Sequence, residues 1–297
     1  MDADRNVRDY LDALKHQRRL SPATLRNYEH ALQLLREMGP GQRPEQIQAA
    51  QVRRAVAVLH GKGLSPRTLA LVLSAWRGWF RWLARHRGLA ANPVLGIRAP
   101  KAARPLPKAL SVEAAQKLLD GGEAKAPADV RDRAMFELLY SSGLRVGELV
   151  ALNAGDGRLD LAQGEVTVTG KGAKTRTVPV GARAREALKR WLAARASLAA
   201  AGEKALFVGG RGRRISAAVV AARLKRWARL AGTPGRVHPH MLRHSFATHV
   251  LQSSQDLRAV QEMLGHASIS TTQVYTHLDF QALAKVYDAA HPRARKK

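Results

Sequence analysis

The chain has 297 residues, with 50 Lys and Arg against 23 Asp and Glu, a formal net charge of +27 at pH 7. This length provides for two domains, and this charge predicts a polyanionic partner held by counterion release. The sequence lacks cysteine, which excludes disulfides and iron–sulfur clusters. It shows no signal peptide and no run approaching the roughly eighteen apolar residues of a membrane helix. We therefore expect a soluble cytoplasmic protein bound to nucleic acid.

Residues 1–91 are predicted to form a helical, DNA-contacting domain. Apolar residues recur at helical spacing through this segment. Ser21-Pro22 and Ser65-Pro66 each combine an N-cap serine with proline in the first helical turn, which is a strong start signal. These two helix starts either meet backbone phosphates, with Arg26 and Arg67 nearby, or simply share one capping solution.

A helix from Pro66 to about His86 is predicted to form the aromatic core of this domain. Its large side chains follow a spacing more typical of a core than of base stacking, and they are Trp76, Trp79, Phe80 and Trp82. Arginine on the opposite face of the helix is then the candidate for DNA contact.

Residues 92–110 are predicted to be an extended basic linker. The segment combines four prolines with several cations; the prolines are Pro93, Pro100, Pro105 and Pro107, and the cations include Lys101, Arg104 and Lys108. Proline at this density excludes a helix or a central strand and favours a semi-stiff connector. Such a linker between two basic domains suits a protein that closes around a duplex as a clamp.

The second domain, residues 111–297, is predicted to begin with helices over 111–120 and 128–140. Gly143 stops the second of these, and helical periodicity resumes after Leu144. Arg145 is therefore expected at a helix start after a glycine turn, where its guanidinium would be directed into a cleft.

Residues 158–180 alternate between apolar and polar side chains, which predicts short antiparallel strands with turns at Gln163-Gly164 and Gly170-Lys171-Gly172. A phosphate-binding P-loop is excluded, because the glycine spacing is one residue too long and Gly172 stands where Ser or Thr should ligate Mg²⁺. Helices over about 182–200 and 216–230 follow. The basic residues of this region form a solvated face or a DNA-backbone contact surface, and they are Arg211, Arg213, Arg214, Arg223, Lys225, Arg226 and Arg229.

The segment from residue 240 to 275 carries the strongest chemical signal. His240 and Arg243 are three residues apart, so they share one face of a predicted helix. Gly265 ends the next helical pattern as a C′ glycine and leaves His266 at the tip of a turn, with Tyr275 nine residues later. One cation, two imidazoles and a phenol are the groups that a phosphodiester needs if a phenolate attacks it.

A zinc site is the competing interpretation of these histidines. His240 and His244 are four residues apart, and His238 and His249 are near. However, no Glu follows His240 to give the His-Glu-x-x-His pattern, and no cysteine completes a zinc set.

His240-x-x-Arg243-His244, Leu264-Gly265-His266 and Tyr275 together resemble the C-terminal signature of the tyrosine site-specific recombinases, the integrase family. The flanks of His266 and Tyr275 resemble the Xer branch, which resolves bacterial chromosome dimers. The resemblance covers nearly the whole chain. It implies a mainly α, multidomain fold, with a SAM-like helical core-binding domain and a C-terminal α+β catalytic domain that contains a small antiparallel sheet.

The resemblance also implies a catalytic set and a role for each member. Two arginines hold the non-bridging oxygens of the scissile phosphate, two histidines donate further hydrogen bonds, a lysine protonates the departing 5′-oxygen, and a tyrosine forms a 3′-phosphotyrosyl bond. The matching residues are Arg145, Lys171, His240, Arg243, His266 and Tyr275. One phosphodiester replaces another, so neither a cofactor nor a metal ion is expected.

Two positions leave the assignment less specific. Lys174 and Arg176 lie close to Lys171, so the choice of Lys171 rests on the resemblance. Gly147 stands where the family often has serine, a difference we expect to be minor.

Implied partners are double-stranded DNA with a dif-like site, a paralogous Xer recombinase in a heterotetramer, and a septal DNA translocase, with no membrane. Residues 279–290 are predicted to form an amphipathic helix that docks into a neighbouring subunit or packs on its own domain. Rival functions are a type IB topoisomerase, a phage or integron integrase, and a helical transcription regulator. The regulator leaves the ordered Arg, Lys, His-x-x-Arg, His and Tyr unexplained.

Overall fold

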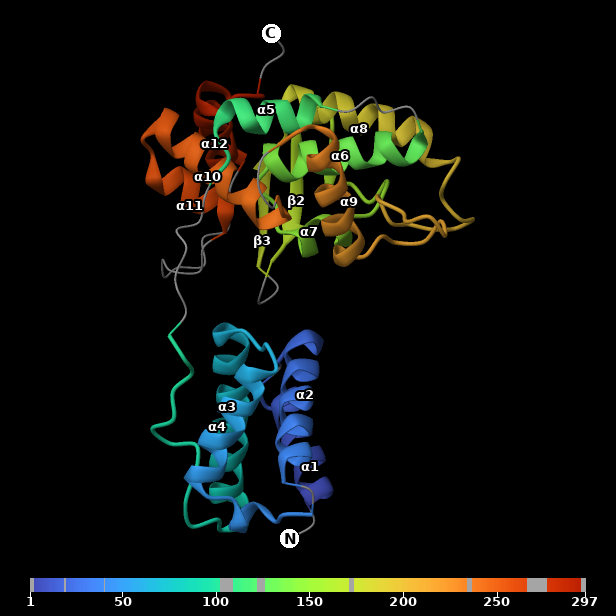
Figure 1. Ribbon diagram of the computed structural model, residues 1–297. Helices are drawn as coiled ribbons and strands as arrows, with labels where there is room; N and C mark the ends of the chain where they lie inside the picture. Colours follow the sequence, from blue (N-terminus) through green and yellow to red (C-terminus); the bar gives the residue numbers. More distant parts are fainter. Residues whose placement is uncertain are drawn as a thin grey trace. The chain divides into compact units, whose positions relative to one another are not determined.

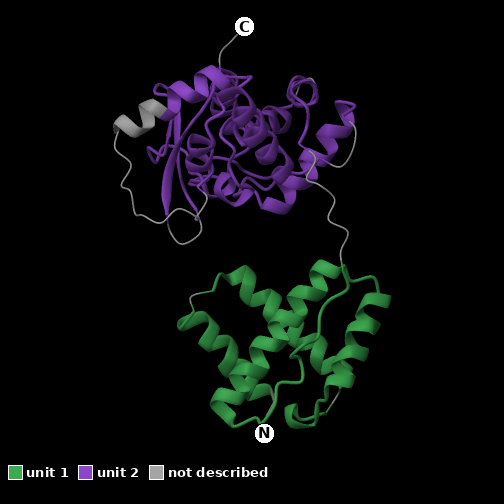
Figure 2. Cartoon of the chain, turned by 90° about the vertical axis from the view of Figure 1, so that its left-hand side faces the viewer, with its two compact units in different colours: residues 1–105 green, residues 106–297 purple. Residues whose placement is uncertain are grey.

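A computed structural model of the chain describes residues 3–18, 20–39, 41–101, 109–121, 126–170, 174–233, 237–265 and 277–294 (Figure 1). The chain forms two compact units, residues 1–105 and 106–297 (Figure 2). The described part is mainly helical with one small antiparallel sheet, which confirms the predicted fold class. No helix in this part is long and apolar enough to cross a membrane.

The first unit contains helices and no strand among its described residues. Its elements are α1 (Ala3–His16), α2 (Pro22–Met38), a 3-10 turn η1 (Pro44–Gln46), α3 (Ala49–Gly61) and α4 (Pro66–Arg87). The predicted serine caps are confirmed, since Ser21 and Ser65 each accept the N–H of the residue three positions later at 3.2 Å. A cap of this kind satisfies an N–H that has no partner within the helix.

Helix α4 supplies the core of this unit, as its aromatic spacing predicted. Trp76, Trp79 and Phe80 are buried, and the Trp76 indole N–H donates to the Ala31 carbonyl of α2 at 2.6 Å. Base stacking by these three rings is therefore excluded. Exposed basic side chains lie on the remaining surface of α4, at Arg67, Arg81 and Arg85.

The second unit contains the sheet and eight helices among its described residues. The helices are α5 (Val112–Asp120), α6 (Pro127–Ser141), α7 (Val146–Ala151), α8 (Ala182–Arg195), α9 (Ala217–Leu230), α10 (Pro239–Ser254), α11 (Leu257–Leu264) and α12 (His277–Ala290). Helix α8 ends five residues before the predicted end. The Arg195 guanidinium donates to the carbonyls of Glu203 and Ala205 at 2.6–3.0 Å and so ties the chain that follows back onto the helix end.

The sheet has the predicted antiparallel order β1 (Leu159–Asp160), β2 (Glu165–Thr169) and β3 (Thr175–Pro179). Glu165 pairs with Pro179 and Thr169 with Thr175, so β2 and β3 form a hairpin. Alternate side chains at positions 166, 168 and 178 are buried in the core. The hairpin closes with the Gly170 N–H donating to the Lys174 carbonyl at 2.8 Å. Residues 171–173 lie outside the described residues.

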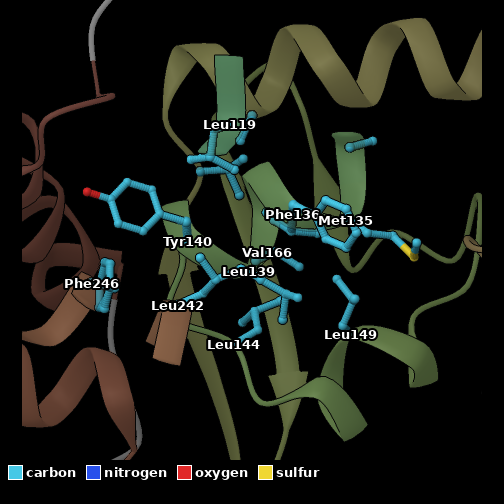
Figure 3. Close-up of a cluster of buried hydrophobic side chains, with 14 of the residues drawn as sticks. Leu119, Met135, Phe136, Leu139, Tyr140, Leu144, Leu149, Val166, Leu242 and Phe246 are labelled. Carbon is cyan, nitrogen blue, oxygen red and sulfur yellow. The ribbon is translucent and has the colours of Figure 1, made fainter. Parts of the chain in front are cut away.

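Helix α6 is the centre of this unit, and its side chains are buried on nearly every face. Figure 3 shows Phe136, Leu139 and Tyr140 of α6 in one cluster with Leu242 and Phe246 of α10. The inner face of α10 is therefore fixed by apolar packing, while its first turns carry His240 and Arg243. The core thus determines where these two side chains lie.

Helix α12 packs on its own unit in this single chain. Leu283, Tyr287 and Ala290 are buried, and the Tyr287 hydroxyl lies 2.7 Å from the Ser141 hydroxyl of α6. Beyond the helix, Arg293 forms a buried ion pair with Glu137 and a second ion pair with Asp120, whose side chain is exposed. In this single chain the tail completes the core of its own domain, and docking into a neighbouring subunit stays a prediction.

Candidate active site

Arg145 occupies the predicted position at a helix start. It is the N-cap residue of α7, its N–H donates to Glu148 at 2.8 Å, and its Nη1 donates to the same carboxylate at 3.0 Å. Gly143 precedes it at φ +58°, and a Cβ there would come within 2.4 Å of the Phe246 ring, so only glycine fits the turn. The Arg145 side chain is 37% exposed, which leaves part of the guanidinium free to meet an anion.

Arg243 lies deeper and connects two segments of the site. It is 8% exposed, and its Nη1 and Nη2 donate to the carbonyls of Gly143 at 2.5 Å and Leu264 at 2.6 Å. Burial and the positive charges of Arg145 and Arg176 lower its pKa to about 10, so it remains charged at pH 7. Arg243 therefore brings the turn before Arg145 to the end of α11.

His240 lies in the first turn of α10, exposed, and one helical turn before Arg243. The helix start is capped by His238, whose Nδ1 accepts the Met241 N–H at 3.2 Å. One ring nitrogen of His238 is therefore used to cap the helix. Pro239 occupies the first helical position, as predicted.

His249 has a structural role. Its Nε2 donates to the Leu110 carbonyl at 2.8 Å, and its Nδ1 accepts from the Tyr140 hydroxyl at 2.8 Å. Burial lowers the pKa of His249 and favours this neutral ring. Both nitrogens are thus occupied, and among the described residues no cluster of three or more His, Cys, Asp or Glu is placed to hold a metal ion.

Glu148 and Arg176 belong to the site, although the sequence analysis assigned them no role. Arg176 Nη1 and Nη2 donate to the two Glu148 oxygens at 2.7 and 2.8 Å, and Nε donates to the Met263 carbonyl at 2.8 Å. Burial alone would raise the pKa of Glu148, but hydrogen bonds from Arg176 and the Arg145 backbone lower it to about 2. The carboxylate is therefore ionised at neutral pH.

A sequence signal for this pair exists in the strand alternation. Arg176 has the same parity as the buried Val178, which places it on the inner face of β3. A buried guanidinium requires an anionic partner, and Glu148 lies three residues after Arg145, in the first turn of α7. Only the tertiary fold brings the two together.

Lys171, His266 and Tyr275 lie outside the described residues. The residues next to the first two are placed, however. Gly265 ends α11 at φ +63°, as predicted, and Gly170 lies at the end of β2. A Cβ at Gly265 would be 2.9 Å from the Arg176 Cδ, and one at Gly170 would be 3.4 Å from a Glu148 oxygen.

The described centre contains three guanidinium groups and one carboxylate, and thus an excess of two positive charges. Two of the guanidinium groups, those of Arg176 and Arg243, are buried and fixed by carbonyl and carboxylate acceptors. The third, on Arg145, is oriented by Glu148 but partly exposed. Such a preorganised cationic centre stabilises an anion and, more strongly, charge that develops on it during reaction.

The basic region around α9 is divided between structural and exposed cations. Arg223 pairs with Asp129 and Asp132, and Arg214 donates to the carbonyls of Val150 and Leu152, so these two stabilise the fold. Arg214 is exposed although its guanidinium makes these contacts, and the other exposed members are Arg211, Arg213, Lys225, Arg226 and Arg229. Only these other members remain candidates for backbone contact.

Comparison with known proteins connects this geometry to a family. Residues 108–282 match the phage integrase family, and residues 7–87 match the phage integrase N-terminal SAM-like domain. Tyrosine recombinase XerC 1 of Ralstonia nicotianae is 56% identical, with 97% of this chain and 93% of the relative covered. Tyrosine recombinase XerC of Ralstonia pickettii is 54% identical, with coverage of 97% and 94%.

A solved recombinase structure is also similar to this chain. The XerH site-specific recombinase bound to a palindromic difH substrate, in a post-cleavage complex, is 27% identical with a TM-score of 0.69, and the match covers 93% of this chain and 82% of that one. The family match spans both compact units, and its larger part contains Arg145 and Arg243. The chain therefore belongs to the phage integrase family and is a tyrosine site-specific recombinase, similar over nearly its whole length to XerC proteins.

Proposed function

We propose that Tyr275 attacks the scissile phosphate of a recombination site and forms a 3′-phosphotyrosyl bond, while the 5′-oxygen leaves. The leaving oxygen takes a proton from Lys171 as its bond to phosphorus breaks. In the second step the 5′-hydroxyl of a partner strand attacks the phosphotyrosine and releases the phenol. The number of phosphodiester-type bonds is conserved, so the reaction needs no high-energy cofactor.

The observation that carries this proposal is the convergence of Arg145 and Arg243. Arg243 donates to the carbonyl of Gly143, two residues before Arg145, and the Arg145 side chain remains 37% exposed. Both cations are suited to the non-bridging oxygens. His240, one helical turn from Arg243, and His266, which follows Gly265, would donate further hydrogen bonds.

Binding is proposed to use both basic units, with a core-binding domain over residues 1–91, a linker over 92–110 and a catalytic domain over 111–297. A groove of about 640 Å³ in the first unit supports a backbone contact there, because it has four cations in its lining, Arg67, Arg77, Arg98 and Lys101. It lies beside the start of α4, where the positive end of the helix dipole also favours a phosphate.

The biological substrate is proposed to be a dif-like site in chromosome or plasmid dimers. The chain would recombine this site as part of a heterotetramer with a XerD-like paralogue. The reaction would take place in the cytoplasm and be controlled by a septal DNA translocase. The XerC relatives at 54–56% identity support this choice over a phage or integron integrase. The solved XerH complex with difH DNA supports a site of this kind as the substrate.

The decisive experiment uses a dif-like DNA duplex with a nick next to the scissile phosphate, so that the short 5′-hydroxyl fragment released by cleavage dissociates and the covalent adduct accumulates. The wild-type chain should give an SDS-resistant protein–DNA band. Tyr275→Phe removes one oxygen, and it should bind the same DNA without forming the band. A band from that variant would exclude Tyr275 as the sole nucleophile. Exchange between two intact sites then separates recombination from type IB relaxation.

A further inference from the structure

One buried ion pair lies where three segments of the proposed site meet. Arg176 and Glu148 are 7% and 6% exposed, and every nitrogen of the Arg176 guanidinium donates a hydrogen bond. Its acceptors are the Glu148 carboxylate of α7 and the Met263 carbonyl in the last turn of α11. The side chain itself comes from β3, so a single residue connects three elements.

Each of these contacts lies next to a proposed catalytic residue. Glu148 accepts two hydrogen bonds from Arg145, one from the backbone and one from the guanidinium. Met263 precedes His266 by three residues, and Gly265 lies so close to Arg176 that a Cβ there would be 2.9 Å from its Cδ. Gly170, the residue before Lys171, adjoins the Glu148 carboxylate. The pair therefore supports Arg145 and the described residues that lie next to Lys171 and His266 in the sequence.

We infer that Arg176 is a positioning residue for strand cleavage: through Glu148 and Met263 it fixes the start of α7 and the end of α11 relative to strand β3. This inference rests on the catalytic residues proposed above. The fork of the guanidinium matches a carboxylate in one planar geometry, which an ammonium does not impose. Misplacement of catalytic groups by about 1 Å costs on the order of 100-fold in rate.

Substitution of Arg176 should also introduce a new acid dependence of the rate. The charged groups facing Glu148 are Arg176 from β3, Arg145 from α7 and, further away, Arg243 from α10. Without Arg176, burial opposes ionisation of Glu148, and only the hydrogen bonds from Arg145 and the more distant charge of Arg243 favour it. Protonation of Glu148 would then release Arg145 at a pH where the wild-type carboxylate is still ionised.

The test is single-turnover cleavage of the nicked dif-like duplex at saturating DNA, with the dissociation constant and the melting temperature of each variant measured in parallel. Arg131→Met is a matched control. Arg131 is also buried, bonds a carboxylate (Asp132) through Nε and Nη2, and bonds a carbonyl (Val208) through Nη1. Its partners belong to none of the proposed catalytic segments. All rates are compared at a temperature where every variant is folded.

Arg176→Met should lower the cleavage rate by at least about tenfold, with the dissociation constant within about threefold of wild type. Arg176→Lys, which keeps the charge but not the fork, should stay clearly below wild type, and it serves as the test if the Met variant does not fold. The rate of Arg176→Met should fall at mildly acidic pH, and Glu148→Gln added to it should remove that inflection. Arg131→Met should cleave at close to the wild-type rate.

Equal losses of rate in the Arg176 and Arg131 variants, or an Arg176→Lys rate equal to wild type, would overturn the inference, because either result indicates general stabilisation alone. The outcome is separable from the proposed function. If the wild-type chain forms no covalent adduct, the proposed catalytic set fails. If it forms the adduct and Arg176→Met cleaves normally, only the positioning role fails.

Discussion

The imidazole of His291 stacks on the ring of Tyr287, with 4.8 Å between ring centroids and 15° between ring planes. Tyr140 and Phe246 approach the same imidazole from α6 and α10, at 5.0 and 5.6 Å. The Nδ1 accepts the Arg293 N–H at 3.2 Å. Tyr287 and His291 thus form a buried aromatic cluster with Tyr140 of α6 and Phe246 of α10.

This cluster predicts a stability that depends on pH. Burial lowers the pKa of His291 to about 3, whereas an unfolded histidine titrates near 6.5. Below pH 6.5, His291 is therefore protonated in the unfolded chain but stays neutral in the folded chain. The free energy of unfolding consequently falls as the pH decreases toward 3. Each such histidine contributes a limiting slope of about 1.4 kcal/mol per pH unit.

His291→Phe should reduce this slope, because phenylalanine retains the stacking and cannot be protonated. Denaturant unfolding between pH 5 and 7 measures the effect in a range where Glu148, with a lowered pKa, stays ionised in both states. His249, whose pKa is also lowered, leaves a residual slope in the variant. A variant slope equal to that of wild type would show that His291 is not the source.

Truncation after Leu278 should destabilise the catalytic domain. The cut removes Tyr287, which hydrogen-bonds Ser141, and Arg293, which pairs with the buried Glu137. Leaving a buried carboxylate without its cation costs about 3–5 kcal/mol. Thermal unfolding measures this directly. An unchanged melting curve would instead favour a tail that docks into a neighbouring subunit.

Arg293→Gln distinguishes the contribution of the Arg293 ion pairs to stability from that of α12. The variant retains α12 and its apolar contacts, so its melting temperature should fall less than that of the truncated chain. If both changes had the same effect, the ion pair alone would account for the contribution of the tail.

Most helices of this protein could be predicted because local signals determine them. The serine–proline starts of α2 and α4 and the glycine after α11 act within one turn, and the structure has them where they were expected. The amphipathic pattern of the tail specified a buried face but not the surface that covers it. That choice depends on partners such as Ser141 and Glu137, which are about 150 residues away in sequence.

The site was predictable where a residue carries its own signal. Arg145 follows a glycine turn, and Arg243 lies one helical turn after His240. Glu148 and Arg176 were missed because their role arises from a contact across 28 positions, between a helix and a strand. The alternation of β3 places Arg176 inside the domain, but the identity of its partner is a property of the fold.

Gly143→Ala should impair both folding and cleavage. The residue has φ +58°, and a Cβ would meet the Phe246 ring at 2.4 Å, so strain and a steric clash add together. Because the Gly143 carbonyl accepts the Arg243 hydrogen bond, any shift of the turn displaces both arginines. We expect a loss of stability of at least about 1 kcal/mol and a lower cleavage rate.

Gly147→Ala is the matched control for that change. Nothing lies within 4 Å of a Cβ at Gly147, and the residue is in the first turn of α7, where alanine favours the helix by up to about 1 kcal/mol. This variant should be as stable as wild type or more stable. Impaired cleavage by a stable Gly147→Ala would show that the glycine itself has a role.

Affinity for duplex DNA should fall steeply with salt. A chain of net charge +27 with basic surfaces in both units is expected to release several counterions, each contributing about 0.9 to the logarithmic slope. Binding isotherms at a series of salt concentrations measure the slope. Arg67→Gln in the groove beside α4 should reduce it by about one, whereas an unchanged slope would exclude that phosphate contact.

The general acid can be identified with a substrate that has sulfur at the 5′-bridging position. A thiolate leaves without a proton, so this substrate should restore cleavage by Lys171→Ala if Lys171 protonates the leaving group. It should not restore Arg243→Ala, whose loss concerns the non-bridging oxygens. Lys174 is the rival: it is exposed, and its carbonyl closes the same hairpin by accepting the Gly170 N–H. Rescue of Lys174→Ala but not of Lys171→Ala would transfer the role to Lys174 and change the proposed catalytic set by one residue.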